Sequence, residues 1–333
     1  MDIGIEGVRR KNELLRKTVS GITLTLLIMS MLTLAFNIQP ATANLPVHNI
    51  DTDLDYAKIQ EAINANETLD GHTIMVDVGV YYENVVLNKT LSLVGENRDF
   101  AVIDANGTGN GIVIQADYSM VENFTIQNGG FGVAIIGKGT KRYVGNVVTG
   151  NVFRNNADAV ALSRCDRNII ANNTFESNGF NIIVGWIDPF GWGDMTSNNN
   201  TIVMNHMTQG FAGILILYSK HNAISENNVS NMTDKGITFL SKSAQLPYLP
   251  VVTNNSISNN VIVDCTFGLF MSGQTSDGYE GGGTGSCNNI TGNVIQQNEL
   301  GLYVDDGGNN TIMNNVLANN VFGMYLDSPN NLL

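Results

Sequence analysis

The sequence predicts an all-β fold, a single-stranded right-handed parallel β-helix that forms a solenoid of 22- to 23-residue coils. The first observation is the composition: 46 asparagines and 35 glycines in 333 residues, with 43% hydrophobic and only 14% charged residues. Asparagine and glycine are poor helix formers, which excludes a helical bundle, while the apolar content is ample for a core. The second observation is a repeat of short apolar stretches with a period of two, which is typical of strands.

The repeat unit begins at an asparagine and continues with strands of three to five residues. Successive units start 22, 23, 28, 32 or 33 residues apart, so the basic unit is 22 or 23 residues and longer units carry insertions. Such a unit is too short for a β-α-β crossover, which needs about 30 residues. Coils stacked in parallel about 4.8 Å apart suit it. The anchor residues are Asn123, Asn151, Asn173, Asn205, Asn228, Asn260, Asn293 and Asn315.

About eight residues after most anchors comes the pattern Gly-apolar-x-apolar, and its two apolar positions predict inward rows of stacked side chains. The first row is Val160, Ile182, Ile214, Ile237, Leu269, Leu302 and Met324. The second row is Leu162, Val184, Ile216, Phe239, Met271, Val304 and Leu326.

Further asparagines recur at fixed distances from the anchors and predict hydrogen-bonded columns at the corners of the coils. Asparagine tolerates the left-handed backbone of tight corners, and its amide can bond to the same residue one coil away. Cys265 occupies one of these positions, which favours a buried thiol, and a bridge to Cys287 stays open. The predicted rows are Asn146, Asn168, Asn200, Asn255, Asn288 and Asn310, and Asn128, Asn156, Asn178, Asn298 and Asn320.

The first 43 residues have the features of an export signal. Basic residues precede an apolar run over 19–36, and an A-x-A site follows at 41–43. The run is also long enough to attach the chain to a membrane. We therefore expect residues 1–43 to be a signal peptide or an N-terminal anchor and residues 44–333 to form the β-helix domain. The protein is then secreted or otherwise extracytoplasmic.

The two ends of the solenoid and its charge lead to further expectations. Residues 56–63 have helical spacing, with Ile59, Ala62 and Ile63 on one face, and predict a helix that caps the first coil. A new coil begins near Asn330, so we expect a partner or a further segment over that end. The net charge is −13, or −15 without residues 1–43 (12 basic against 27 acidic), which disfavours nucleic acid as a partner.

Three stretches near the start of the repeats carry a resemblance to a known family. They are residues 59–64 (IQEAIN), 79–84 (GVYYEN) and 91–96 (LSLVGE), followed by the asparagine-rich coils. Over about residues 51–333 the chain resembles the NosD-like family of the pectin-lyase-like fold, whose repeats are called CASH repeats, after carbohydrate-binding proteins and sugar hydrolases. The resemblance implies a secreted or periplasmic protein. It also implies a copper-associated accessory role, because the family's namesake assists the assembly of nitrous oxide reductase.

The insertions predict a binding groove. They fall near 136–144, 185–197, 241–253 and 272–286, after the same strand of the unit, and such insertions gather on one side of a solenoid. That strand points Ile183, Leu215, Phe270, Tyr303 and Tyr325 outward. Rings there would stack on sugars while carboxylates accept hydroxyl hydrogen bonds. The alternative is that the insertions simply bury an apolar wall. The predicted ligand-binding residues are Trp186, Trp192, Phe270, Tyr279, Tyr303 and Tyr325.

These features predict a binding or structural module at the cell surface, with carbohydrate or a cell-surface glycan as the ligand. The first alternative is a polysaccharide-active enzyme, a glycosidase or a lyase. The catalytic motifs of pectin methylesterases, polygalacturonases and pectate lyases are missing, and the acidic charge would repel polyuronates. The candidate catalytic residues for that alternative are Asp188, Asp194, Glu280 and Asp305.

The second alternative is a periplasmic copper-associated accessory protein. Copper(I) prefers sulfur ligands, and the coils contain no H-x-H or C-x-x-C cluster. We therefore predict no specific metal site and no cofactor, with calcium and copper left open. Eleven N-x-[Ser/Thr] sequons also occur. Because most fall on the asparagine rows, the predicted columns explain them without glycosylation, and those in loops stay candidates for modification.

Overall fold

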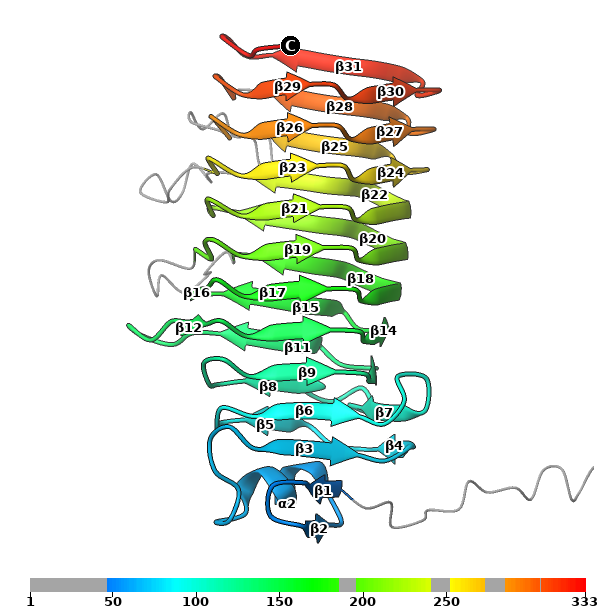
Figure 1. Ribbon diagram of the computed structural model, residues 1–333. Coiled ribbons are helices and arrows are strands. Elements are labelled where there is room, and N and C mark those ends of the chain that lie inside the picture. Colours follow the sequence, from blue (N-terminus) through cyan, green and yellow to red (C-terminus); the bar gives the residue numbers. More distant parts are fainter. Residues whose placement is uncertain (1–46, 186–195, 241–251, 273–284, 306) are drawn as a thin grey trace, which may run out of the picture. The chain divides into compact units, whose positions relative to one another are not determined.

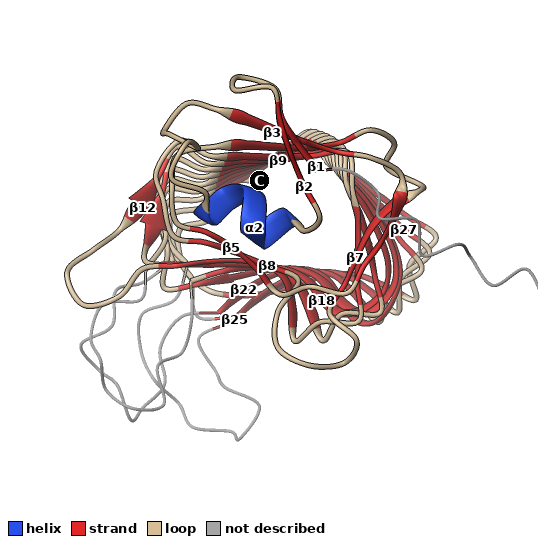
Figure 2. Ribbon diagram, turned by 90° about the horizontal axis from the view of Figure 1, so that it is seen from below, coloured by secondary structure: helices blue, strands red, loops and turns tan. Residues whose placement is uncertain are grey.

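The computed structural model describes residues 47–185, 196–240, 252–272, 285–305 and 307–333. Over these residues the chain from Val47 onward winds into coils of short strands that stack one above another (Figure 1). Successive coils pair in parallel, and a view along the stack shows them superposed around one interior (Figure 2). The predicted right-handed parallel β-helix is confirmed.

One wall of the stack is a 12-stranded sheet. It starts with β1 (Val47–Asn49), which pairs antiparallel with β2 (Leu54–Tyr56) and with β3 (Thr73–Val76). Each later coil adds one parallel strand. These strands are β6 (Ser92–Gly95), β9 (Met120–Glu122), β13 (Val147–Thr149), β17 (Ile169–Ala171), β19 (Thr201–Val203), β21 (Ala223–Ser225), β23 (Ser256–Ser258), β26 (Asn289–Thr291) and β29 (Thr311–Met313).

A 17-stranded sheet forms the rest of each coil in two rows of strands. The first row is β4 (Gly79–Tyr81), β7 (Ala101–Asp104), β10 (Thr125–Gln127), β14 (Val152–Arg154), β18 (Thr174–Val184), β20 (His206–Leu217), β22 (Asn228–Leu240), β24 (Val261–Val263), β27 (Val294–Gln296) and β30 (Val316–Ala318). The long strands β18, β20 and β22 continue into the second row. The rest of that row is β5 (Val85–Leu87), β8 (Ile112–Ile114), β11 (Phe131–Ile136), β15 (Asp158–Ser163), β25 (Phe267–Ser272), β28 (Leu300–Asp305) and β31 (Phe322–Asp327).

The inward side chains form the stacked aliphatic rows that the sequence predicts. Ile182 pairs in register with Ile214, Ile214 with Ile237, and Ile237 with Leu269. All four side chains are fully buried. Burying one side chain of this size stabilises the fold by about 2 kcal/mol, so the repeated row holds the coils in superposition. The first predicted row ends at Met324 on the last coil, which is 40% exposed.

A glycine precedes most of these inward positions because neighbouring coils approach closely there. At Gly268 an added Cβ would lie 2.6 Å from the carbonyl oxygen of Gly301 and 2.4 Å from Cγ2 of Ile295. A side chain at that position would therefore push the coils apart. The recurring glycine of the repeat is a packing requirement.

Asparagine side chains form hydrogen-bonded columns along the corners of the coils. The side-chain oxygen of Asn200 accepts bonds from the backbone N–H and from Nδ2 of Asn168, at 2.9 and 3.0 Å. Nδ2 of Asn200 then donates to Asn222. Without these bonds, the amide groups buried at the corner would have no hydrogen-bond partner. The first column is Asn146, Asn168, Asn200, Asn222, Asn255, Asn288, Asn310 and Asn331; the second is Asn151, Asn173, Asn205, Asn227, Asn260, Asn293 and Asn315; a third joins Asn156 to Asn178 and Asn298 to Asn320.

The columns differ from the predicted rows. The anchor asparagines from Asn151 onward form a column of their own, which the sequence analysis did not predict. Asn227 rather than Asn228 belongs to it, and Asn123 lies outside it. The prediction for Asn128 is wrong: the N–H of Gly129 stands in the column and donates to Asn156. Asn128 has a φ of 59°, and its side chain donates to Asp104 instead.

The left-handed backbone conformation belongs to the residue before each column asparagine, which corrects the expected role of the columns at tight corners. Asn199 and Asn254 have φ angles of 57° and 56° and are exposed. Asn200 and Asn255, which follow them, are buried in the column. The recurring Asn-Asn pair therefore divides two tasks, because the first residue makes the turn and the second bonds to the neighbouring coils.

Helix α2 (Ile59–Asn64) lies across the first coil, where Figure 2 shows it from the end of the stack. Its buried residues are Ile59, Ala62 and Ile63, the three that helical spacing placed on one face. The carboxylate of Glu83 accepts bonds from the backbone N–H groups of Ile59 and Gln60, both at 3.0 Å. A helix start leaves such groups without intrahelical partners, so Glu83 of the GVYYEN stretch has a structural use. A capping role of α2 stays a prediction.

The predicted insertions follow β11, β18, β22 and β25 along the chain. The segment 136–144 ends in β12 (Tyr143–Val144), which pairs with β16 (Cys165–Asp166). Most of the other predicted insertions lies outside the described residues, as do residues 1–43 with the expected signal or anchor. Among the described residues, no helix is both long and apolar enough to cross a membrane.

Candidate functional site

Several predicted site residues lie on neighbouring strands of one outer face. Phe270 is on β25, Tyr303 and Asp305 are on β28, and Tyr325 is on β31. The remaining predictions fall outside the described residues, and their places in a groove stay predictions. They are Trp186, Asp188, Trp192, Asp194, Tyr279 and Glu280.

The side chains on this outer face form a continuous surface, which we call the aromatic face. It combines rings, carboxylates and one ammonium group from four successive coils. Its members are Lys235, Phe267, Phe270, Tyr303, Asp305, Tyr325 and Asp327.

The rings of the aromatic face stack because their strands pair in register. Phe270 pairs with Tyr303, and Tyr303 pairs with Tyr325. The ring centroids of the first pair are 4.8 Å apart with an interplanar angle of 4°, and those of the second are 4.9 Å apart with an angle of 10°. The ring spacing is the spacing of the coils, so the repeat itself builds the stack.

The ammonium group of Lys235 contacts the end of the ring stack that faces the earlier coils. Nζ of Lys235 lies 5.0 Å from the ring centroid of Phe270 and 5.4 Å from that of Phe267. Phe267 also meets Phe270 edge-on, with centroids 5.1 Å apart. Asp234 pairs with the same ammonium at 2.6 Å. Lys235 therefore combines a cation–π contact with an ion pair.

Each tyrosine of the stack donates a hydrogen bond to a carboxylate two residues later. The distance from the hydroxyl oxygen to Oδ2 is 3.3 Å both for Tyr303 and Asp305 and for Tyr325 and Asp327. Partial burial and then the charge of Asp305 raise the pKa of Tyr303, and the charge of Asp327 raises the pKa of Tyr325. Both hydroxyl groups therefore stay protonated donors at neutral pH.

The stacked geometry corrects one part of the predicted binding mode. Both faces of the Tyr303 ring are covered, by Phe270 and by Tyr325. The two faces of Phe270 meet Tyr303 and the ammonium of Lys235. Sugars therefore cannot stack on these two rings, because stacking needs a free ring face. The surface instead offers ring edges, hydroxyl groups and carboxylates.

The same outward row is buried farther toward the N-terminus. Ile183 and Leu215, which the sequence analysis placed on the outside, are only 3% and 9% exposed. They form an apolar cluster with Leu217 and Tyr218. Tyr325 at the other end of the row is 44% exposed. The row is thus a buried apolar wall in the middle coils and an accessible aromatic surface in the last coils.

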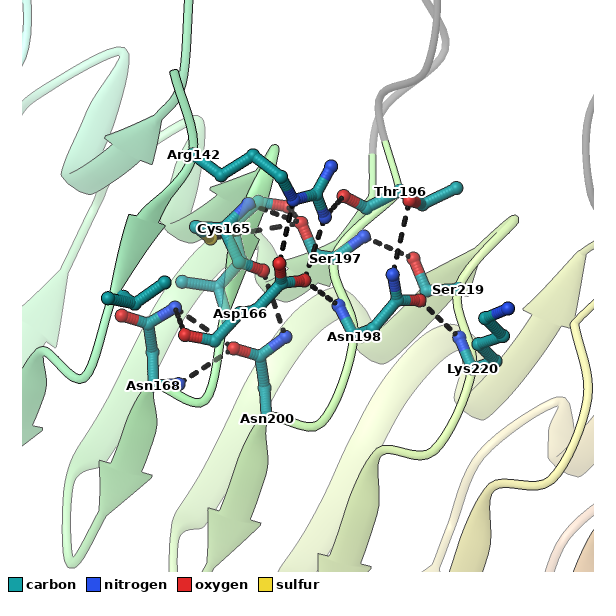
Figure 3. A network of polar contacts seen from close by, with 12 residues as sticks. Arg142, Cys165, Asp166, Asn168, Thr196, Ser197, Asn198, Asn200, Ser219 and Lys220 are labelled. Carbon is teal, nitrogen blue, oxygen red and sulfur yellow. Dashed lines mark hydrogen bonds and ion pairs between the residues drawn. The ribbon is translucent and has the colours of Figure 1, made fainter. Parts of the chain in front are cut away.

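A polar network that the sequence analysis missed lies at the corner beside this wall (Figure 3). Arg142 binds both carboxylate oxygens of Asp166 at 2.7 Å and donates to the carbonyl of Thr196 at 2.6 Å. The N–H of Asn198 donates to the same carboxylate at 2.8 Å. Burial would raise the pKa of Asp166, but the bonds from Arg142 outweigh it and hold that pKa below its usual range. The network joins three coils at the point where residues 196–198 re-enter the stack.

The described cysteines are all free thiols, and Cys265 and Cys287 form no bridge. Burial raises the pKa of Cys165 to about 12 and that of Cys265 to about 11. Metals bind thiolates, so burial disfavours both side chains as ligands. Among the described residues, no three His, Cys, Asp or Glu side chains gather closely enough to hold a metal ion. The described residues therefore offer no cluster of these four residue types for a metal ion.

A family model described as periplasmic copper-binding protein (NosD) matches residues 63–243 and 188–332. The chain belongs to the NosD family. The residues that carry the resemblance have structural tasks here, such as the contact of Glu83 with α2, so membership fixes the fold more firmly than the chemistry.

The NosD-family chain is also similar to a curated relative, a cell surface glycoprotein of Methanothermus fervidus. The two are 27% identical over an alignment 260 residues long, and the match covers 68% of this chain. The chain spans only 41% of the length of that relative.

Solved structures support the same fold. An alginate lyase from Paenibacillus sp. FPU-7 has a TM-score of 0.52 and 15% identity, covering 80% of this chain and 94% of the lyase. The A-module of a mannuronan C-5 epimerase from Azotobacter vinelandii has a TM-score of 0.50 and 14% identity, covering 82% and 92%. At these identities the likeness concerns the fold alone.

The last coil exposes apolar side chains. Phe322 is 63% exposed, and a cavity of about 240 Å³ opens beside Met324 and Leu333. The expectation that a partner or further segment covers this end stays a prediction.

Proposed function

We propose that this NosD-family chain is an extracytoplasmic, cell-surface β-helix module that binds carbohydrate along the aromatic face. The observation that carries the proposal is the in-register stack of Phe270, Tyr303 and Tyr325, with a carboxylate paired to each tyrosine hydroxyl. The name of the curated relative, a cell surface glycoprotein, and the family description as periplasmic both support the location.

The chemistry of the face selects its ligand. Asp305 and Asp327 repeat on adjacent coils, since their strands pair them in register. Carboxylates accept hydrogen bonds from sugar hydroxyls, and ring edges contact the C–H groups between those hydroxyls. With a net charge of −13 and two carboxylates on the face, a neutral polysaccharide is favoured over a polyuronate.

Removal of the hydroxyl acceptors tests the proposal. A glycan array probed with the full chain first identifies neutral glycans that bind. Asp305→Asn with Asp327→Asn should then weaken binding to them about 30-fold, because each of the two charge-assisted bonds contributes about 1 kcal/mol. Isothermal titration with the wild-type chain gives the reference affinity.

Two further variants locate the effect. Tyr325→Ala should weaken binding several-fold, whereas Tyr118→Ala should not, since Tyr118 is 68% exposed but lies outside the aromatic face. Circular dichroism checks that each variant keeps the fold. Absence of any bound glycan, or equal affinities for all variants, would contradict the proposal.

A further inference from the structure

The sequons that the predicted columns seemed to explain lie beside the columns. Asn199 is exposed and left-handed, Asn200 is buried in the column, and Thr201 is the first residue of β19. The sequon Asn-Asn-Thr thus places its acceptor on the outside of the corner and the column residue in the middle. The earlier interpretation, in which the columns account for the sequons, is wrong for this reason.

The same separation holds throughout the chain. The acceptors of the eleven sequons are Asn66, Asn88, Asn106, Asn123, Asn172, Asn199, Asn228, Asn231, Asn254, Asn289 and Asn309. None of them belongs to a column, and all except Asn123 are exposed. An asparagine of the first two columns cannot be the acceptor of a sequon. A sequon needs Ser or Thr two positions later, where these columns have an inward apolar residue, such as Ile202 after Asn200.

We infer that this chain carries N-linked glycans on its exposed corner asparagines, and that the main site is the row Asn199, Asn254 and Asn309. The corner backbones stack, since the N–H of His221 donates to the carbonyl of Thr253 and that of Cys287 to Gly308. The three acceptors therefore occupy alternate coils of one column. They are about 10 Å apart, which is twice the coil spacing.

The modification is a group transfer from a lipid-linked oligosaccharide. The bond between the anomeric carbon of the first sugar and the lipid phosphate breaks, and a bond from that carbon to Nδ2 of the asparagine forms. The amide loses one proton to a base, and the lipid phosphate or pyrophosphate leaves. The Ser or Thr hydroxyl of each sequon is required for the transfer.

The structure explains why such glycans are compatible with folding. A glycan on Asn200 would block Nδ2, which donates to Cys165 and to Asn222 inside the column. A glycan on Asn199 leaves every column bond intact, because this side chain is outside the stack. The ten exposed acceptors can therefore be modified before folding without disrupting a column.

The test uses the full chain in a host whose secretory pathway attaches N-glycans, followed by glycopeptide mass spectrometry. We expect glycan mass on the peptide that contains Asn254, its complete loss in Ser256→Ala, and no change in Ser258→Ala on the same strand. Ser256→Thr should keep the glycan. Unmodified Asn199, Asn254 and Asn309 in chain that has crossed the membrane would overturn the inference.

This inference rests on the extracytoplasmic location within the proposed function but not on carbohydrate binding. Cell fractionation separates the two, because only chain recovered from the medium or the lumen is scored for occupancy. Retention of the full chain in the cytosol would contradict the location and the modification together. Glycan-array binding with an empty Asn254 would contradict the modification alone.

Discussion

The first coils and the later coils share one fold but hold their corners with different chemistry. Near the start, carboxylates accept the hydrogen bonds of the donors at the corners. Asp104, for example, accepts from the side chains of Gln127 and Asn128 and from the N–H of Asn106. From Asn146 onward the columns of asparagine side chains take over. The change occurs within one coil, where the N–H groups of earlier residues already donate to the first column asparagines.

The difference shows which hydrogen-bonding property lets the same residue type recur at a corner in successive coils. A carboxylate only accepts hydrogen bonds, so its network ends where its donors end. Carboxylates stacked in every coil would also repel one another. An amide donates and accepts, so that each asparagine can bond to the next without accumulating charge. The later coils can therefore repeat the same corner residue from coil to coil, while each of the first coils has a different set of corner contacts.

Breaking a column should produce the largest effect. The oxygen of Asn288 accepts two bonds from Asn255, and its nitrogen donates to Asn310. Asn288→Ala leaves buried groups of both neighbours without partners, and we expect a loss of about 3 kcal/mol in the free energy of unfolding. Urea unfolding followed by circular dichroism measures it.

The adjacent residue supplies the matched control. Asn289 is exposed on β26, and Asn289→Ala should change the free energy of unfolding by less than about 0.5 kcal/mol. Equal losses for the two alanine variants would mean that the columns do not hold the later coils together.

A carboxylate of the first coils should show a smaller and pH-dependent effect. Asp104→Asn places an amide nitrogen against the donors of Gln127 and Asn128 and should cost about 2 kcal/mol at pH 7. Burial raises the pKa of Asp104, but these hydrogen bonds outweigh it, so the pKa lies below its usual value. The stabilisation is present above the unfolded pKa, near 4, and disappears as the pH falls through the folded pKa.

The lowered pKa of Asp104 determines how its stabilising effect should depend on pH. The difference between wild type and Asp104→Asn should shrink as the pH is lowered toward 2, when the wild-type carboxyl is protonated too. A difference that stays constant from pH 7 to pH 2 would mean that the charge of Asp104 contributes nothing.

Asp158 sharpens the comparison because it places a carboxylate among the later coils. Burial raises its pKa to about 6, despite a hydrogen bond from the backbone of Phe180. Between about pH 4 and pH 6 the folded chain keeps a proton that the unfolded chain loses, so stability falls as the pH rises through this window. Asp158→Asn should therefore stabilise the fold by roughly 1 kcal/mol at pH 7 and by much less at pH 4. Destabilisation at pH 7 in thermal unfolding would contradict this account.

The sequence predicted the coil stack well because its inward positions repeat the same kind of residue. Ile214, Ile237 and Leu269 follow the 22- to 33-residue steps, and parallel pairing superposes them. The column asparagines were harder to assign, because in each Asn-Asn pair either residue could make the turn. Only the direction of each side chain, which the backbone sets, separates the two.

The candidate site was predicted in part. Phe270, Tyr303 and Tyr325 were found because they face outward at one position of the repeat, but Lys235 and Asp327 were missed. The repeated Gly-x-Tyr-x-Asp pattern, at residues 301–305 and 323–327, could have indicated the second carboxylate. No sequence pattern predicts the contact between Arg142 and Asp166, because it joins an insertion to a corner 24 residues later.

Side-chain footprinting of the glycan complex tests the central claim most directly. Hydroxyl radicals oxidise exposed aromatic side chains, so a bound glycan should lower the oxidation of Tyr303 and Tyr325 several-fold. Tyr82 and Tyr118, which are 70% and 68% exposed elsewhere on the chain, should be oxidised equally with and without glycan. Protection of Tyr82 or Tyr118 with no change at Tyr303 and Tyr325 would contradict carbohydrate binding on the aromatic face.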